Sequence, residues 1–265
     1  TADIKAPECS AMLELVRCEY QLTVGRPPVE TAVRFRAVDD VAAADLFLAR
    51  TPGFESEPLD RRLIELNASS IRFTSGTTAF FKGVVLSHEG IAERIEVANR
   101  ALKITQDDTI FFALQMAHHF AVSVMLHLSV GATIVTGGAF LGDTMTKTIR
   151  RHRVTVIYGT PVTYRTLADA PNIDAMSGVR LALSTAMPLS PEIEQHFEQQ
   201  TGVPLSQALG IIEVGMPIMN LSNPRPVRGS LGRLVDGFAA RVVAESGNDV
   251  TPGEPGELWL RGPGM

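Results

Sequence analysis

Apolar and polar positions along the chain follow two patterns, one of strand period and one of helix period. In the first run of strand period, Val33, Phe35 and Ala37 alternate with Arg34 and Arg36. Several later runs begin or end at glycine or proline, as strands commonly do. These runs predict further strands at 71–74, 84–86, 109–114, 132–136, 154–158, 179–183, 205–209, 239–244 and 257–261.

Longer amphipathic segments of helix period separate the strands. They predict helices at 89–103, 118–130, 142–152, 162–169 and 190–201. Ser190 followed by Pro191 is typical of an N-cap and a first-turn proline, and Ser87 is the N-cap predicted for the first helix. Strands and helices alternate from about residue 70 to residue 210. This order predicts an α/β fold of layered, largely parallel sheets with flanking helices.

The pattern changes after residue 228. Residues 229–265 are rich in glycine and proline and carry two predicted strands but no predicted helix. We expect the start of a separate small β subdomain there. Because a natural domain seldom ends on an open apolar strand, we expect this subdomain to be truncated.

Composition narrows the function classes. A length of 265 residues suggests one or two domains, and a net charge of −5 argues against a general nucleic-acid binder or a membrane-surface protein. Cys9 and Cys18 cannot form a disulfide framework, although one disulfide stays possible. The longest apolar run is interrupted by His127 and is much shorter than the roughly 20 residues that span a bilayer. We therefore expect a soluble, cytoplasmic protein without a nucleic-acid partner or a membrane span.

The stretch IRFTSGTTAFFKGVVLSH, residues 71–88, carries the strongest chemical signal. One strand is predicted to end at Phe73 and another to follow Gly83, with Gly76 and Lys82 between them. Four hydroxyl residues accompany them: Thr74, Ser75, Thr77 and Thr78. Hydroxyls and free backbone N–H groups in a tight turn form an anion site, and a nearby lysine can neutralise a phosphate oxygen. It is not a Walker A loop, because Phe81 and Gly83 flank the lysine. The plainer interpretation is a polar hairpin with an exposed lysine.

The segment FTSGTTAFFKGV resembles the phosphate loop of the adenylate-forming enzymes, a superfamily of acyl- and aryl-CoA synthetases, peptide-synthetase adenylation domains and luciferases. The usual form of that loop is an aromatic residue, TSGTTG, one residue and PKGV. Six further segments are similar to family motifs and occur in the family's order: LQMAHHFAVS (114–123), VIYGTPVTY (156–164), LALSTAMPLSPEI (181–193), QALGIIEVG (207–215), GSLGRLV (229–235) and GELWLRGPG (256–264).

The resemblance also implies a domain organisation. Residues 1–69 would be the end of a first α/β subdomain, 70–228 the adenylation core, and 229–265 the start of the β subdomain. Family chains are longer on both sides, so the sequence is identified as a central fragment of the N-terminal domain. The ribose-binding aspartate and the C-terminal domain with its catalytic lysine would lie beyond Met265.

Family chemistry has two steps, and the resemblance assigns residues to the first. A carboxylate attacks the α-phosphate of ATP to give an acyl-adenylate, and a thiol of coenzyme A or of a carrier-protein pantetheine arm then takes the acyl group. The resemblance implies catalytic roles for Lys82, Glu213 and His118, with Glu213 as the Mg²⁺ ligand. ATP would be bound by Thr74, Ser75, Gly76, Thr77, Thr78, Lys82, Thr185, Ala186, Met187, Leu209, Gly210 and Ile212.

The segment with the pocket-gating histidine also suggests a substrate class. MAHHFAVS contains no acid, so the α-amine of an amino acid would have no counter-charge there. The implied lining of His118, Phe120, Ala121 and Ile211 is mostly apolar, which favours a fatty or aryl carboxylic acid. The spacings of the three nearby histidines, His118, His119 and His127, do not suit zinc, and ordinary packing is the alternative for each.

Rival signals are weak, but departures from the family pattern leave a second hypothesis open. GGAFLG (137–142) lacks the dinucleotide-binding spacing, and no G-x-S-x-G elbow occurs. However, Ala79 and Phe81 replace a glycine and a proline, Leu209 replaces an aromatic residue, and Ile212 replaces a phosphate-binding threonine. The alternative is therefore a non-catalytic binding module. The 265 residues alone are not expected to complete thioester formation.

Overall fold

The computed structural model describes residues 20–24, 33–35, 46–50, 58, 60–74, 82–136, 141–171, 173–221 and 227–265. The chain forms two compact units. In the first, β1 (Tyr20–Val24), β2 (Val33–Phe35) and β3 (Leu46–Arg50) form an antiparallel sheet of order β1-β3-β2. The same unit includes α2 (Arg61–Glu65), whose N-cap Asp60 accepts a hydrogen bond from the Arg62 backbone N–H.

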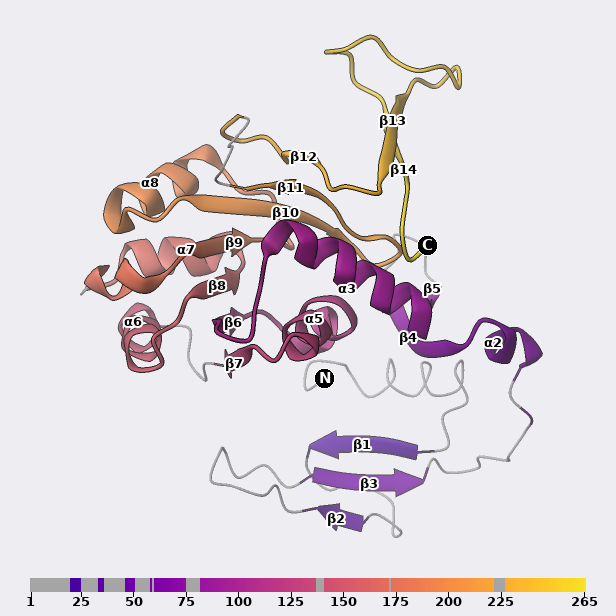
Figure 1. Ribbon diagram of the computed structural model, residues 1–265, viewed down its shortest axis with the longest axis horizontal. Helices are drawn as coiled ribbons and strands as arrows, with labels where there is room; N and C mark the ends of the chain where they lie inside the picture. The colour runs from indigo at the N-terminus through magenta and orange to yellow at the C-terminus, as the bar shows by residue number, and fades with distance from the viewer. Residues whose placement is uncertain are drawn as a thin grey trace. The chain divides into compact units, whose positions relative to one another are not determined.

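The second unit contains Asn67–Thr74 and Lys82–Met265 and is built around a seven-stranded sheet (Figure 1). The strand order is β12-β11-β10-β9-β8-β6-β7. The strands from β10 to β7 in that order are parallel, and β11 and β12 extend the sheet in antiparallel pairs. Their bounds are β6 (Thr109–Ala113), β7 (Thr133–Thr136), β8 (Val156–Gly159), β9 (Leu181–Ser184), β10 (Leu205–Ile211), β11 (Gly215–Asn220) and β12 (Arg233–Leu234). The predicted α/β class with a largely parallel sheet is confirmed.

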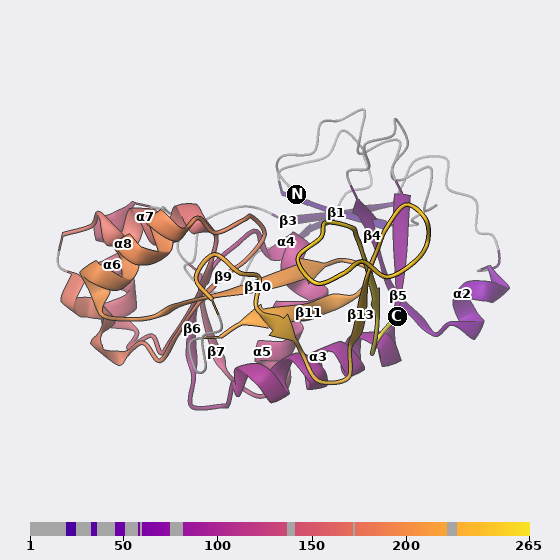
Figure 2. The ribbon, with the colours of Figure 1, turned by 90° about the horizontal axis from the view of Figure 1, so that it is seen from above.

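Helices cover both faces of this sheet, as the two views show (Figures 1 and 2). Successive residues of β6 supply the two cores, since Ile110 and Phe112 join one buried cluster and Phe111 joins the other. The first cluster packs under α3 (His88–Leu102) and α5 (Met125–Ser129). The second packs under α6 (Gly142–Arg151), α7 (Pro161–Ala168) and α8 (Pro191–Thr201).

The ends of two helices follow the predicted capping. The Ser87 hydroxyl accepts a hydrogen bond from the Gly90 N–H at the start of α3, and the Ser190 hydroxyl accepts one from Ile193 at the start of α8, where Pro191 is the first helical residue. Within the described residues, no helix is long and apolar enough to cross a bilayer.

Three predicted elements differ from the structure. The single helix expected at 118–130 is instead α4 (Met116–His119), a π-helical turn η1 (Phe120–Val124) and α5. The strands on either side of the phosphate loop, β4 (Ala68–Thr74) and β5 (Lys82–Ser87), form a separate antiparallel pair outside the parallel sheet. Four observed strands have no counterpart among the predicted ones: β1, β3, β11 and β12.

The last part of the chain contains a second antiparallel pair, β13 (Ala239–Val243) and β14 (Glu257–Arg261). These are the two strands predicted for 229–265, and no helix lies in that range. β12, which is also within it, belongs to the seven-stranded sheet. The domain boundaries given above stay predictions.

Candidate functional site

The candidate site lies at the carboxyl ends of the parallel strands. From β6 the chain moves outward to β7 and then crosses back to β8 on the other side of β6, so the winding direction reverses between β6 and β8. In open α/β sheets, ligands bind outside the carboxyl ends of the strands at such a reversal. His118 follows β6, Thr185 directly follows β9, and Ile211 ends β10. The structure therefore brings these three predicted residues to one edge of the sheet.

The phosphate loop is closed by the β4–β5 pair. Thr74, the last residue of β4, lies directly opposite Lys82, the first residue of β5. Ser75, Gly76, Thr77 and Thr78 lie outside the described residues, as do Ala79 and Phe81. The pair is tied to the segment after β6 because the Arg72 guanidinium donates a hydrogen bond to the His118 carbonyl. The base of the loop and the gating segment are thus held together by a residue that the sequence analysis did not single out.

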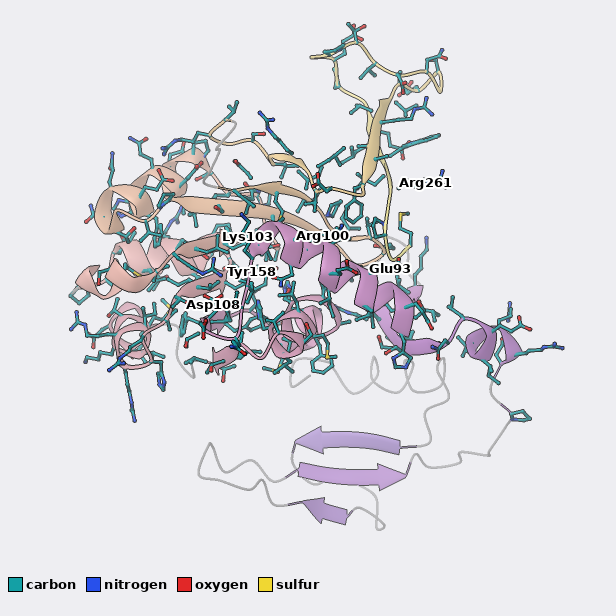
Figure 3. All side chains as sticks on the ribbon, in the orientation of Figure 1. Glu93, Arg100, Lys103, Asp108, Tyr158 and Arg261 are labelled. Atoms are coloured by element: carbon teal, nitrogen blue, oxygen red, sulfur yellow. The ribbon has the colours of Figure 1, made fainter. Side chains whose placement is uncertain are left out.

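The π-helical turn η1 positions two of the predicted pocket residues. Phe120 is half exposed, whereas Ala121 is buried, so the two side chains leave the turn on different sides. A π turn is rare and occurs frequently at functional sites. The Ser123 hydroxyl in this turn donates a hydrogen bond to the buried Tyr158 hydroxyl of β8 at 3.1 Å, which fixes the turn against the sheet (Figure 3 labels Tyr158).

The three histidines differ in environment. His118 is exposed, whereas His127 is buried and its Nδ1 atom has no hydrogen-bond partner. The pKa values of both His119 and His127 are lowered to about 4, chiefly by burial. The charges of Arg72 and His118 add to the shift at His119, and the charge of Asp108 opposes it at His127. The His119 and His127 rings stack edge-on against Tyr158. Packing therefore accounts for these two histidines, and His118 alone is open to a ligand.

The turn after β9 is the place predicted for the adenine ring. The buried Thr185 hydroxyl donates to the Ala208 carbonyl at 3.0 Å, which joins β9 to β10. Ala186 has a left-handed backbone with φ 68°, and Met187 is exposed. A methyl group added at Gly210 would meet only the Thr185 hydroxyl, at 3.6 Å, so there is open space beside this backbone. A flat ring can approach the chain there.

The segment after β10 carries the candidate metal ligand. The register of β10 against β11 shifts between Leu209 and Ile211, and such irregularities often re-aim side chains next to active sites. Leu209, Ile211 and Ile212 are half-buried, whereas Glu213 is exposed. Mg²⁺ is commonly held by one or two carboxylates together with substrate phosphates, so a single exposed carboxylate fits this role. The described residues contain no cluster of three or more potential metal ligands.

Comparisons with known proteins identify the family of the chain. The sequence pattern of the family described as "AMP-binding enzyme" matches residues 2–265. The chain belongs to this family. It is 30% identical over 228 residues to 4-coumarate–CoA ligase-like 9 of Arabidopsis thaliana, which covers 82% of this chain and 40% of that protein. It is 29% identical over 213 residues to a long-chain-fatty-acid–CoA ligase of Yersinia pestis, covering 76% of this chain and 37% of that protein.

Solved structures of family members are similar as well. Apo MatB from Rhodopseudomonas palustris matches with a TM-score of 0.70 and 25% identity, covering 76% of this chain and 40% of that chain. A benzoate CoA ligase from Burkholderia xenovorans matches with a TM-score of 0.62 and 28% identity, covering 69% of this chain and 39% of that chain. The chain therefore spans about 40% of the length of the AMP-binding enzymes that it matches.

A second residue near the AMP-binding family motifs, after Arg72, was missed by the sequence analysis. Arg94 of α3 is 3% exposed, and its guanidinium donates to the carbonyl oxygens of Ile212 and Glu213. Burial lowers its pKa, and the charge of Glu213 opposes that shift. A signal was available, because Arg94 lies three residues after Ile91 and three before Val97 on the buried stripe of the helix. A charged residue on such a stripe needs a partner.

Proposed function

We propose that the protein containing this chain activates a carboxylic acid with ATP, forming an acyl-adenylate and pyrophosphate. The observation that supports the proposal is a pair of contacts within the second unit, one between the base of the phosphate loop and the segment after β6, and one between the turn after β9 and β10. Arg72 ties the Thr74–Lys82 pair to His118, and the hydroxyl of Thr185 ties the 185–187 turn to β10 just before Glu213. Parallel sheets bind ligands at this edge.

The charge and position of each residue suggest which part of the substrates it would bind. Lys82 would neutralise a β- or γ-phosphate oxygen beside the hydroxyl groups of the loop, because an ammonium group is a compact point charge. The open backbone around Gly210 would take the adenine, and Leu209 would cover a ring face by dispersion. Glu213 would hold Mg²⁺, which when bound reduces the negative charge that repels an incoming carboxylate. His118 and Phe120 would line the acyl pocket.

We propose a fatty or aryl carboxylic acid as the substrate. Phe120 is 50% exposed, Ala121 is buried and Ile211 is half-buried, so the implied lining is mostly apolar. The relatives named above as 4-coumarate and long-chain-fatty-acid CoA ligases favour the same substrate class. The acyl group would then pass to a thiol of coenzyme A or of a carrier-protein pantetheine arm, in the whole protein.

Acid-dependent exchange of labelled pyrophosphate into ATP tests this proposal in the whole protein, with a panel of fatty and aryl acids. We expect exchange with at least one acid, and a loss of roughly 100-fold or more in Lys82→Ala, because one preorganised charge at a reacting phosphate is worth about that much. Lys147→Ala is the matched control, since Lys147 is an exposed lysine on α6 paired with Asp143. Exchange that is unaffected in Lys82→Ala would contradict the assigned role.

The non-catalytic binding module stays the second hypothesis, because Ile212 places an apolar, half-buried side chain where the family pattern has a hydroxyl. Calorimetric titration with Mg-ATP separates the two. Saturable binding without pyrophosphate exchange, together with no gain of exchange in the Ala79→Gly/Ile212→Thr double variant, would favour the binding module.

A further inference from the structure

The buried side chain of Arg94 joins two segments that are far apart in sequence. Its Nη1 atom donates to the Ile212 carbonyl at 2.7 Å and its Nη2 atom donates to the Glu213 carbonyl at 2.5 Å. On its other side, the Nε and Nη2 atoms donate to the Gly264 carbonyl at 2.9 and 2.5 Å. One guanidinium group therefore holds two of the three carbonyls in the turn between β10 and β11, and the carbonyl of a residue that follows β14.

The backbone around the guanidinium group is shaped to fit it. Gly215 has φ 101°, and a methyl group added there would lie 3.2 Å from the Arg94 Cγ atom. Gly264 has φ 75°, and a methyl group there would lie 2.6 Å from the same Cγ atom and 2.5 Å from the Gly90 carbonyl. The Gly264 N–H donates to the Glu93 carboxylate at 2.8 Å (Figure 3 labels Glu93). Both glycines allow the two backbone segments to approach the helix closely.

The contacts of Arg94 bear on Glu213 through the main chain. The carboxylate of Glu213 is exposed, and the backbone hydrogen bond from the Val214 N–H to the Ile211 carbonyl closes its turn. Charge-assisted hydrogen bonds are about twice as strong as neutral ones, and a planar guanidinium can satisfy several acceptors at fixed angles. Fixing the two carbonyls of residues 212 and 213 fixes the direction in which the Glu213 side chain leaves the turn.

We propose that Arg94 is a positioning residue that orients Glu213 for the metal–nucleotide complex and couples that orientation to the chain segment at Gly262–Met265. The inference rests on the proposed function, because it assigns Glu213 a metal. A movement of the 262–265 segment away from α3 would release one of the acceptors of the guanidinium and change the geometry of the turn. The segment after β14 would thereby influence metal binding without touching the metal.

Hydrogen–deuterium exchange of the whole protein tests the coupling without any measurement of activity. We expect Arg94→Met to accelerate amide exchange at 210–216 and at 262–265 by roughly tenfold or more, because hydrogen bonds to a charged group are lost at both. Arg94→Lys should give a smaller acceleration, since one ammonium cannot span three carbonyls. Arg100→Met, an exposed arginine of the same helix, should change neither segment. Unchanged exchange at 210–216 in Arg94→Met would overturn the inference.

The Mg²⁺ dependence of pyrophosphate exchange gives the second readout. In Arg94→Lys, and in Arg94→Met if it folds, we expect the half-saturating Mg²⁺ concentration to rise by roughly tenfold, as for other residues that orient a metal ligand. The KM for the acid should stay unchanged, whereas a general loss of structure would raise it as well. Glu93→Gln should loosen 262–265 more than 210–216. If the wild-type protein exchanges no pyrophosphate, the proposed function fails, and the amide-exchange result still decides whether Arg94 couples the two segments.

Discussion

The two edges of the seven-stranded sheet differ in the side chains that cover them. At the amino edge, Asp108 precedes β6, Thr155 precedes β8 and Arg180 precedes β9. The Asp108 carboxylate is buried and accepts hydrogen bonds from the Thr155 hydroxyl at 2.7 Å and from the Arg180 guanidinium at 2.8 and 2.6 Å (Figure 3 labels Asp108). Although burial raises its pKa, these bonds lower it to about 2.

The carboxyl edge carries exposed apolar side chains. Ala186 has a left-handed backbone, the segment after β6 contains a π turn, and Phe120 and Met187 are exposed. Exposed apolar side chains are open to a ligand, whereas the Asp108 carboxylate is closed to solvent. We therefore expect the amino edge to stabilise the fold and the carboxyl edge to keep groups available for binding. The predictions below test that division.

Asp108→Ala should give the largest effect on stability. The change leaves the Thr105 N–H and the Thr155 hydroxyl without their buried acceptor and Arg180 without its ion-pair partner. We expect a loss of about 2 kcal/mol in the free energy of unfolding, measured by urea denaturation, because leaving hydrogen-bonding groups without their acceptor costs about 1–3 kcal/mol. Asp143→Ala, which removes an exposed pair on α6, should cost less than about 1 kcal/mol. A loss of ATP use in folded Asp108→Ala would contradict the expectation that the amino edge only stabilises the fold.

The pH dependence of stability should show two windows. The pKa values of His119 and His127 are lowered to about 4 in the folded chain from 6.5, so only the unfolded chain takes up these protons, and stability falls as the pH drops from 6.5 to 4. The pKa of Asp108 is lowered to about 2 from the ordinary 3.8. The contribution of Asp108 to the free energy of unfolding, about 2 kcal/mol, is therefore fully present above pH 3.8 and is lost as the pH falls toward 2.

Urea midpoints measured across this pH range check both windows. His127→Gln should reduce the fall in stability between pH 6.5 and 4 and leave the part that His119 contributes, whereas Asp108→Asn should flatten the curve only below 3.8. If His127→Gln instead removed the loss of stability below pH 3.8, His127 and Asp108 would titrate as one unit.

The sequence predicts what depends on local pattern. The strand predicted at 109–114 and the caps at Ser87 and Ser190 are local features, and they are confirmed. Strand β11 was missed because it contains Pro217 and is buried throughout, which contradicts both the alternation and the usual exclusion of proline from inner strands. The π turn at Phe120–Val124 was missed because residues of helix period predict an uninterrupted helix.

The candidate site was predictable only through its motifs. The hydrophobic periodicity identifies no ligand. Roles could be assigned to Thr185 and Glu213 only because the segments that contain them are similar to family motifs. Arg94 escaped this reasoning because its partners are backbone carbonyls, which no side-chain pattern records. The positions of the loop residues Ser75, Gly76, Thr77 and Thr78 stay predictions.

Ile212→Thr should increase ATP use through the carboxyl edge without changing the contacts of the amino edge. A threonine hydroxyl at this half-buried position would supply a donor to a phosphate oxygen. A hydrogen bond to a charged group is worth roughly 1.5–3 kcal/mol, so kcat/KM for ATP should rise by about tenfold in pyrophosphate exchange. Ile212→Val removes apolar bulk without adding a donor and is the matched control. An equal gain in both variants would assign the effect to space instead of hydrogen bonding.

Ala186→Gly and Lys103→Gly should give the smallest effects, and they compare the two edges directly. Both residues have left-handed backbones, with φ 68° at Ala186 on the carboxyl edge and φ 54° at Lys103, which ends α3 near the amino edge. Left-handed geometry costs a residue with a side chain about 1–2 kcal/mol, and the greater freedom of glycine in the unfolded chain offsets part of that gain. Each change should therefore stabilise the fold by about 0.5–1 kcal/mol in urea denaturation. Only Ala186→Gly should alter the KM for ATP, because only its turn lies beside the proposed adenine position. An equal change of KM in Lys103→Gly would contradict this, because it would show that backbone strain at either edge affects ATP binding.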